Sequence, residues 1–549
     1  MARGKTKAQT RQQRKPYAFS EGLIVAAAEL DIDPSDDTIA DRKDGPIGVT
    51  PKRLSKEKRK RKIKSKPLKI SDTAMMEICA VSKPLWDLHL ELQPAFEHTP
   101  GDGGRPCEYV AADALVFWLA KWSYGGERPA ERNLADLQTW KRLRKAVKRA
   151  HPDNKRFRLS KRPPSRDQYR RFRKAVADRA EFDKMLDKID AISILIATSI
   201  GLFNRNDPFS TPSSTSCIIS DGTWIPALYK ARIEEAVDPE TGEKLHAYDP
   251  EALQYTRDSK GNIVRSAGHH AVITEARAPH PGERVPLSVR LLAQPSPDNP
   301  QSECTLAIDM AFKLINGIEG EGGKVCAFIY DMAMHQTHRD RLLDAGIIPV
   351  GKVQRTKGGH YAYRNLGKHK FKLTDGTMRW LKAEAIDGSP AVAFRDSAGN
   401  EHYAVLERIK AHRDYQAMRI VVWGHWRLPD VAGVPKKLRG AVVLICHNST
   451  PDEINNSYRR TRALSVLPET DPRGEDLLGL RQDVESLNSD LKARLPRSRA
   501  GTIGRNPLLF ELAGYQLFTG IKALVHYMRR LGLRKLEDWF GTHKIPPNT

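Results

Sequence analysis

The sequence predicts a mixed α/β fold, in which antiparallel strands come first and helices and strands then alternate. The expected strands are residues 216–219, 268–277, 285–292, 325–330 and 347–350. A Pro281-Gly282 turn joins the second strand to the third, and helical patterns at 303–315 and 334–345 separate the later strands. This order of elements implies a mixed sheet with helices packed on it.

The segment before this sheet has a helical pattern. Ser71-Asp72 can cap a helix that runs to about Val81, and further helices are expected at 111–122, 134–150 and 165–180. The longest apolar run, 191–203, is shorter than a membrane span and contains serine and threonine, so we expect a buried helix there. We therefore predict a soluble protein without a membrane segment.

Residues 357–428 are rich in short β-type segments separated by Gly, Asp and Asn turns. A buried strand at 442–446, a helix at 477–492 and helices to about Leu533 follow. The predicted organisation is a basic arm (1–68), a helical region (69–205), a first core part (206–356), a β-rich insertion (357–430) and a second core part (431–535).

The charge of the chain points to a polyanionic partner. The formal net charge is +24 over 549 residues, while a hydrophobic fraction of 40% is enough to build folded domains. Nucleic acid is the expected partner because neutralised phosphates release counterions. A ribosome-associated or membrane-surface protein is the alternative that charge alone leaves open.

Basic residues concentrate in the N-terminal part. Residues 51–70 contain eleven Lys or Arg, which predicts either an arm that holds DNA phosphates or a solubility tail. Within 165–180 four basic residues crowd together: Arg170, Arg171, Arg173 and Lys174. We expect these four to contact DNA, the alternative being the charged outer face of an ordinary helix bundle.

The six cysteines are scattered and form no C-x-x-C pair. This spacing argues against a zinc finger and against a disulfide framework, and it fits a reducing cytoplasm. Gly346 and Lys352 match the frame of a phosphate-binding loop, but Val353 replaces the required Ser or Thr and the intervening residues form a strand. We therefore predict no nucleotide cofactor.

Three acidic residues stand where a fold can bring them together. Asp221 is expected to end one apolar strand, Asp331 to end another, and Glu485 to lie on the late helix. Three converging carboxylates favour hard divalent cations, chiefly Mg²⁺ or Mn²⁺. Two such ions, about 3.5–4 Å apart, would support in-line phosphoryl displacement.

Each of these acids also has a plain structural explanation. Asp221-Gly222 after a strand is a common hairpin turn. Asp331 before a helix is a common helix cap. Glu485 lies four residues after Arg481, the spacing of a surface salt bridge on a helix. Only the joint pattern favours catalysis.

The joint pattern resembles the DDE transposases of bacterial insertion sequences. The resemblance is carried by Ile218-Ile219-Ser220-Asp221-Gly222-Thr223, by Phe328-Ile329-Tyr330-Asp331, and by the helix, Gly-Ile and strand that follow the second aspartate. One group of the family carries Tyr-x2-Arg-x3-Glu-x6-Lys around the catalytic glutamate. Here Arg481, Glu485 and Lys492 match that signature and Leu478 replaces the tyrosine.

The resemblance implies an RNase H-like catalytic core with Asp221, Asp331 and Glu485 as metal ligands. On a helix, Arg481, Glu485 and Lys492 lie within about 40° of one another, which leaves Arg481 and Lys492 free for DNA phosphates. Lys352 and Arg355, just past a predicted strand, are further candidate phosphate contacts.

The insertion contains Trp380, Trp423 and Trp426, each with arginine nearby. Exposed aromatic rings among basic residues can stack on a base. Packing in the core of a small β-domain is the use that we expect for these tryptophans.

The predicted function is metal-dependent cleavage at transposon ends followed by strand transfer into target DNA. As in the family, we expect a homo-oligomer on transposon terminal repeats, working in a bacterial cytoplasm on the nucleoid. The alternative is a DNA-binding protein, such as a repressor, descended from a transposase that no longer cuts.

Overall fold

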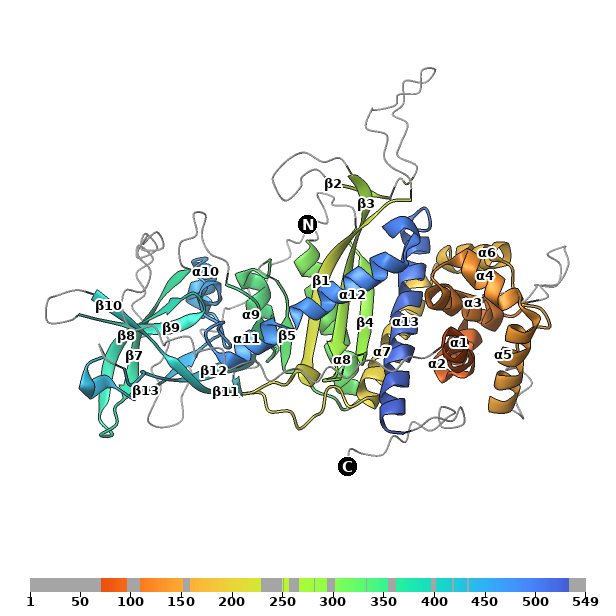
Figure 1. Cartoon of the computed structure of the whole chain (residues 1–549). Helices are drawn as coiled ribbons and strands as arrows, with labels where there is room; N and C mark the ends of the chain where they lie inside the picture. The colour runs from red at the N-terminus through yellow and green to blue at the C-terminus, as the bar shows by residue number, and fades with distance from the viewer. Residues whose placement is uncertain are drawn as a thin grey trace, which may run out of the picture. The chain divides into compact units, whose positions relative to one another are not determined.

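The computed structural model is a mixed α/β protein with helices and two sheets, one of which is a curled half-barrel (Figure 1). It describes residues 71–95, 109–151, 158–228, 249, 251–255, 266–280, 282–293, 302–331, 333–353, 362–395, 401–416, 419–431 and 434–532. The chain divides into two compact units. Of the described residues, the large unit comprises those within 71–333 and 476–532, and the small unit comprises those within 334–475. The predicted basic arm, 1–68, lies outside the described residues.

The large unit begins with helices. They are α1 (Asp72–Val81), α2 (Lys83–Leu92), η3 (Gln93–Ala95), α3 (Ala111–Tyr124), α4 (Glu127–Ala135), α5 (Leu137–Ala150), α6 (Arg166–Ala177) and α7 (Phe182–Ser199). The predicted caps at Ser71 and Ser165 are confirmed, since each hydroxyl accepts a backbone N–H three residues on. The single helix predicted at 134–150 is wrong, because Asp136 ends α4 and caps α5.

A short 3-10 turn, η4 (Ser214–Ser216), directly precedes the first strand of the large unit. The strands of its sheet are β1 (Cys217–Pro226), β2 (Leu253–Tyr255), β3 (Ser266–Arg277), β4 (Arg284–Leu291) and β5 (Ala327–Ile329). Strand β1 runs antiparallel to β3 and parallel to β5, while β4 and β2 both pair antiparallel with β3. Four antiparallel strands, β1 to β4, therefore precede the parallel strand β5, and the sheet is mixed, as the order of elements predicted.

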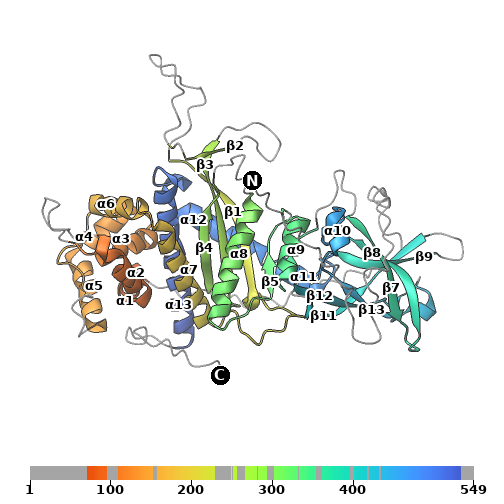
Figure 2. The ribbon, with the colours of Figure 1, turned by 180° about the vertical axis from the view of Figure 1, so that it is seen from behind.

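Helices cover this sheet. Helix α12 (Arg481–Arg494) packs on β1 and is seen in front of the strands in Figure 1, while α8 (Glu303–Gly320) is in front when the molecule is turned (Figure 2). Helices α7 and α13 (Arg505–Arg530) pack against β4, and α13 also contacts α3 and α6. One continuous set of contacts thus joins the N-terminal helices to the sheet.

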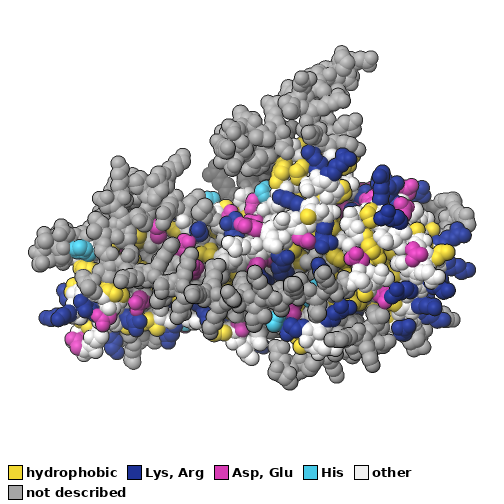
Figure 3. Space-filling view, in the orientation of Figure 1, with side chains coloured by type: hydrophobic (Ala, Val, Ile, Leu, Met, Phe, Trp, Pro, Cys, Tyr) yellow, Lys and Arg dark blue, Asp and Glu magenta, His cyan; other side chains and the backbone are white. Residues whose placement is uncertain are grey.

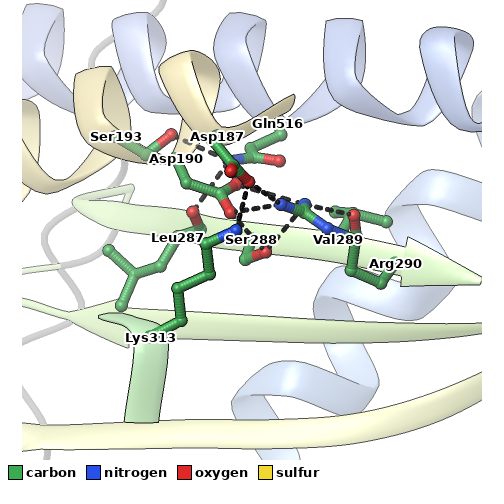
Figure 4. A network of polar contacts seen from close by, with 9 residues as sticks. All are labelled: Asp187, Asp190, Ser193, Leu287, Ser288, Val289, Arg290, Lys313 and Gln516. Atoms are coloured by element: carbon green, nitrogen blue, oxygen red, sulfur yellow. Dashed lines mark hydrogen bonds and ion pairs between the residues drawn. The ribbon is translucent and has the colours of Figure 1, made fainter. Parts of the chain in front are cut away.

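A buried polar network connects α7, β4 and α13 (Figure 4). The Asp190 carboxylate accepts hydrogen bonds from Ser288 Oγ (2.9 Å), Gln516 Nε2 (3.0 Å) and Arg290 Nη2 (2.7 Å). At the edge of the network, Lys313 pairs with Asp187. Every carboxylate oxygen of Asp190 has a partner, which is what a buried charge needs if it is to support a fold.

The small unit is built on the half-barrel. It contains α9 (Gln336–Asp344), β6 (Ile348–Val350), β7 (Tyr363–Lys372), β8 (Met378–Ile386), β9 (Ser389–Arg395), β10 (Glu401–Val405), β11 (Glu407–Gln416), β12 (Arg419–Arg427), η5 (Lys436–Leu438), β13 (Val442–Cys446), α10 (Pro451–Asn455) and η6 (Arg460–Arg462). The antiparallel order β10-β9-β8-β7-β13-β12-β11 encloses a core that includes Leu366, Phe371, Trp426 and Ile445.

The half-barrel is larger than the predicted insertion. We assigned 357–430 to the insertion and 442–446 to the core, but β13 pairs with β12 and β7 inside the half-barrel sheet. The compact unit accordingly extends over Met334–Glu475. The sequence of a buried strand does not indicate which sheet the strand joins.

Two further local predictions are wrong. Strand β1 continues to Pro226, so Asp221 lies within the strand and Asp221-Gly222 is no turn. The helix predicted at 477–492 is divided into α11 (Pro472–Leu478) and α12, so that Leu478 and Arg481 of the signature lie on different helices. A short 3-10 turn, η7 (Pro496–Ser498), follows α12.

Helix α13 is the one helix in the described ranges that is long and apolar enough to cross a membrane. However, 83% of its most apolar window is buried inside the protein. The predicted buried helix at 191–203 is confirmed in part as the end of α7. This burial is consistent with a soluble protein.

Candidate functional site

Asp221 occupies the middle of β1, directly under α12. Its side chain is largely buried, with a relative exposure of 9% for the residue. Asn488, on the buried face of α12, donates a hydrogen bond from Nδ2 to Asp221 Oδ2 (3.0 Å). Val484, Leu487 and Leu491 are buried on the same helix, so an apolar stripe anchors α12 on the strand.

The electrostatic surroundings of Asp221 are acidic. Burial raises the pKa of Asp221 to about 6, and the Arg481 guanidinium opposes this rise. The carboxylates of Glu303, Asp331 and Glu485 raise the pKa further. Asp331 and Glu485, the other two acids singled out in the sequence, therefore lie close enough to Asp221 to affect its pKa, and so does Glu303.

The guanidinium of Arg481 bridges two of these acids. Its Nη2 atom lies 3.9 Å from Asp221 Oδ1 and 3.3 Å from Glu485 Oε1. The salt bridge between Arg481 and Glu485 that the spacing allowed is thus formed. The Glu485 side chain is about half exposed (51%). Arg481 supplies the positive charge that the carboxylates need.

Lys492 also faces the site. Burial lowers the pKa of its ammonium, and the Asp221 carboxylate partly offsets that effect. Asp221 interacts electrostatically with both Arg481 and Lys492. The two basic residues of the signature therefore lie near the Asp221 carboxylate.

Asp331 follows β5 at the edge of the same sheet. Its carboxylate accepts a hydrogen bond from the backbone N–H of Ala333 (2.7 Å). Asp331 does not cap a helix, because α9 begins at Gln336 and its N-cap is His335. Across the described part of the chain, no three His, Cys, Asp or Glu side chains stand close enough together to hold a metal ion as they are placed.

Glu303 is a site residue that the sequence did not identify. Tyr330 donates a hydrogen bond to Glu303 Oε1 (2.5 Å), and His270 Nε2 lies 2.7 Å from Oε2. Burial alone would raise the pKa of Glu303, but these partners and the backbone N–H of Gly222 lower it. Gly222 is required here, because a Cβ on it would lie 2.2 Å from the Glu303 carboxyl carbon.

The Glu303 carboxylate consequently connects β1, which carries Asp221, to the segment after β5, which carries Asp331. Gly222 is next to Asp221 on β1, and Tyr330 is next to Asp331 after β5. In the sequence, Glu303 follows the N-cap Ser302, where an acid ordinarily serves the helix dipole. No local signal distinguished it from such a residue.

Glu275 is a second acid that the sequence did not reveal. It is completely buried on β3, opposite Ile219, and neither of its carboxylate oxygens has a hydrogen-bond partner in the described structure. Burial raises its pKa to about 7, against the opposing charges of Arg284 and Arg277. Those two arginines hold Asp483 of α12, through an Arg277–Asp483 ion pair and a hydrogen bond to its carbonyl.

The basic cluster predicted on 165–180 is only partly available to DNA. Arg173 is a correction: its Nη1 lies 2.6 Å from Glu511 and 3.0 Å from Glu127, and Glu511 is buried. Arg170 pairs with Glu127 at 2.9 Å. Arg171 and Lys174 are exposed on α6, in a part of the surface with many Lys and Arg side chains (Figure 3).

The remaining candidates lie in the small unit. Lys352 is exposed and pairs with Glu469 at 3.4 Å, while Arg355 lies outside the described residues. Trp426 (1% exposed) and Trp423 (7%) are core residues, as expected. Trp380, with 47% exposure, is the exception and is not core.

Comparison with known proteins adds nothing to this description. No protein-family model matches the chain, and no curated protein shows significant sequence similarity to it. The candidate site therefore stands on its own residues.

Proposed function

We propose that this protein is a DDE-type DNA transposase of a bacterial insertion sequence, which cleaves DNA at transposon ends and transfers the strand into target DNA. The observation that carries the proposal is the placement of the three acids around Arg481 and β1: Arg481 Nη2 lies 3.9 Å from Asp221 and 3.3 Å from Glu485, and the carboxylates of Asp331 and Glu485 both help to raise the pKa of Asp221. These residues are far apart in the sequence, yet they belong to one compact unit. Acids gathered against their own repulsion are typical of functional sites.

The donor set fits divalent cations. Carboxylate oxygens are the ligands that Mg²⁺ and Mn²⁺ prefer, and the raised pKa of Asp221 marks a place that favours added positive charge. Asp221 and Asp331 would hold two ions and Glu485 would complete one site. When bound, such ions activate a water or 3′-hydroxyl and stabilise the leaving oxygen.

The neighbouring side chains of α12 would then bind DNA phosphates or orient Asp221. Arg481 leaves its position between Asp221 and Glu485 to admit the cation and pairs with a DNA phosphate, as its exposure of 38% permits. Lys492 contacts phosphate from the same helix. Asn488 keeps one Asp221 oxygen oriented through the 3.0 Å hydrogen bond.

The arrangement of the sheet supports an RNase H-like core. In support, β1 to β4 are antiparallel, β5 is parallel to β1, Asp221 lies on β1, and Asp331 follows β5 by two residues. The net charge of +24 supports DNA as partner. By the family resemblance, the protein would act as a homo-oligomer on terminal repeats, in the cytoplasm and associated with the nucleoid.

Cleavage of the DNA that flanks the element, by purified protein with Mg²⁺ or Mn²⁺, tests the proposal. Asp331→Asn should reduce metal-dependent cleavage by about a hundredfold to a thousandfold, while retaining DNA binding. Glu319→Gln is the matched control, because Glu319 is an exposed acid of α8 outside the site. This variant should cleave like the original protein.

Two results would contradict the proposal. Tight binding to the ends without cleavage by the original protein, with either metal, would favour a transposase-derived repressor. Cleavage that survives Asp331→Asn unchanged would remove Asp331 from the site.

A further inference from the structure

One end of the Asn488 side-chain amide is hydrogen-bonded, and the other end has no hydrogen-bond partner among the described residues. The Nδ2 atom donates the 3.0 Å hydrogen bond to Asp221 Oδ2, whereas the Oδ1 atom is enclosed by the protein. An acceptor that is buried without a donor costs free energy. Such an oxygen beside an acidic site therefore calls for a functional explanation.

The orientation of this amide follows from the charge of Asp221. If the amide were turned over, its oxygen would face the carboxylate, and two acceptors would repel each other. With Nδ2 toward Asp221, the amide oxygen is the end that remains to bind a positive group. Asn488 engages Oδ2 of Asp221 and leaves Oδ1, the carboxylate oxygen that lies 3.9 Å from Arg481 Nη2.

Asn488 lies on the face of α12 that carries the signature residues. On an α-helix, positions 481, 485, 488 and 492 fall within about 60° of one another. The signature itself leaves position 488 unspecified. Of the four residues Asn488 is the buried one, with 6% exposure, and it is three positions from Glu485, so the two side chains are neighbours on the helix surface.

We propose that Asn488 Oδ1 is a further ligand of the divalent cation that Asp221 and Glu485 hold, while Nδ2 keeps the Asp221 carboxylate oriented. An amide oxygen is a hard donor of the kind that suits Mg²⁺ and Mn²⁺ beside carboxylates. It adds an oxygen to the set without a further negative charge, where Glu303, Asp331 and Glu485 already raise the pKa of Asp221. The inference rests on the proposed function for the presence of the cation.

A purely orienting residue is the competing explanation for Asn488. In that case Nδ2 has the whole role of the side chain, and an enclosed water satisfies Oδ1. Loss of an orienting partner already weakens metal binding by about tenfold to a hundredfold. Asn488→Ala would therefore weaken binding under either explanation, and a change of ligand chemistry is needed to separate them.

The experiment compares Mn²⁺ and Cd²⁺ binding by the full chain and its Asn488→Cys variant, without DNA. Thiolates select soft metals, so the variant should bind one Cd²⁺ with the ultraviolet absorption of a thiolate–metal bond, beyond that of the original protein. Its Mn²⁺ affinity, from the paramagnetic resonance of the free ion, should fall about tenfold or more. Gln482→Cys is the matched control, because Gln482 is an exposed amide of the same helix, and it should show neither change.

A second variant, Asn488→Asp, decides the question if Asn488→Cys does not fold. The carboxylate keeps a hard oxygen at this position but removes the N–H donor to Asp221. As a ligand, it should bind Mn²⁺ more tightly than Gln482→Glu, which adds the same charge at an exposed position of α12. An orienting role predicts weaker binding than in that control.

Asp221→Asn distinguishes a failure of this inference from a failure of the proposed function. It should weaken Mn²⁺ binding by the original protein and Cd²⁺ binding by Asn488→Cys, each about tenfold or more. If Asp221→Asn weakens Mn²⁺ binding but Asn488→Cys gains no Cd²⁺ absorption, only the role of Asn488 as a ligand is overturned. Mn²⁺ binding that is absent, or that Asp221→Asn leaves unchanged, would contradict the proposed function and this inference together.

Discussion

Two acidic clusters of the large unit, one around the buried Asp190 and one around the buried Asp221, differ in how fully their carboxylates are hydrogen-bonded. Around Asp190, Ser288, Arg290 and Gln516 supply partners for both carboxylate oxygens (Figure 4). Around Asp221, the carboxylates of Glu303, Asp331 and Glu485 raise the pKa of Asp221 further. The first cluster includes residues of β4 and the second includes Asp221 of β1, and both strands belong to the same sheet.

The difference separates a structural cluster from a functional one. Buried polar groups that support a fold are hydrogen-bonded, and the Asp190 cluster follows this rule. The Asp221 region departs from it, since Glu275, on the same sheet, has two buried oxygens without partners in the described structure. Such departures are expected where a site awaits a charged ligand.

Removing a partner from the satisfied cluster should have the largest effect on stability. Arg290→Ala would leave Asp190 as a buried charge without its main counter-ion, and we expect a loss of about 3–5 kcal/mol in the free energy of unfolding. Urea denaturation measures it. Lys313→Ala is the control: Lys313 is 57% exposed in the same network, and its loss should cost at most about 1 kcal/mol. An equal loss of stability in Arg290→Ala and Lys313→Ala would mean that burial of the ion pair does not determine its contribution.

Neutralising Glu275 should stabilise the protein at high pH. Its pKa is raised from 4.5 to about 7 in the fold, so the folded state binds the proton more tightly than the unfolded state does. The stability of the original protein should therefore fall as the pH rises from about 4.5 to about 7. Glu275→Gln should lack this fall and be more stable at pH 8 by about 1–3 kcal/mol.

The comparison of Glu275→Gln with the original protein uses urea denaturation at pH 4 and at pH 8. Below the unfolded pKa the two proteins should be equally stable, because the carboxyl is protonated in both states. Glu319→Gln, at an exposed position, should change neither value. A destabilised Glu275→Gln at pH 8 would show that the buried carboxylate contributes favourably to the fold.

The smallest effect is expected for Glu303→Gln, as a reduced rate of DNA cleavage. Glu303 acts on Asp221 and Asp331 through Gly222 and Tyr330, so we expect it to position the aspartates. The amide keeps the shape but loses the charge beside His270, and kcat for cleavage should fall about tenfold with KM nearly unchanged. A fall in melting temperature that accounts for the lost activity would assign Glu303 a structural role only.

The sequence predicted the helices and strands better than it predicted which of them pack or pair together. The strands around Asp221 and Asp331 and the caps at Ser71 and Ser165 follow from local periodicity and turn chemistry, and the structure has them. The break between α11 and α12 and the extension of β1 past Asp221 were missed. Local patterns are weak at element ends, where packing decides between continuation and a break.

The site was predicted in the same uneven way. Asp221, Asp331 and Glu485 are candidates because of their places at strands and on a helix, and in the structure Asp331 and Glu485 affect the pKa of Asp221. The sequence gives no sign that Arg173 pairs with the buried Glu511, 338 residues further along the chain. Glu303 and Glu275 had no distinguishing neighbours in the chain.

By itself the sequence determined the net charge, the α/β class, the amphipathic helices and three acids at suitable positions, because these depend on composition and on periods of two and 3.6 residues. Only the tertiary structure decided that β13 joins the half-barrel, that Arg481 bridges two carboxylates and that Trp380 is exposed. Those properties depend on which distant residue lies beside each side chain, and burial and neighbouring charge then fix its chemistry.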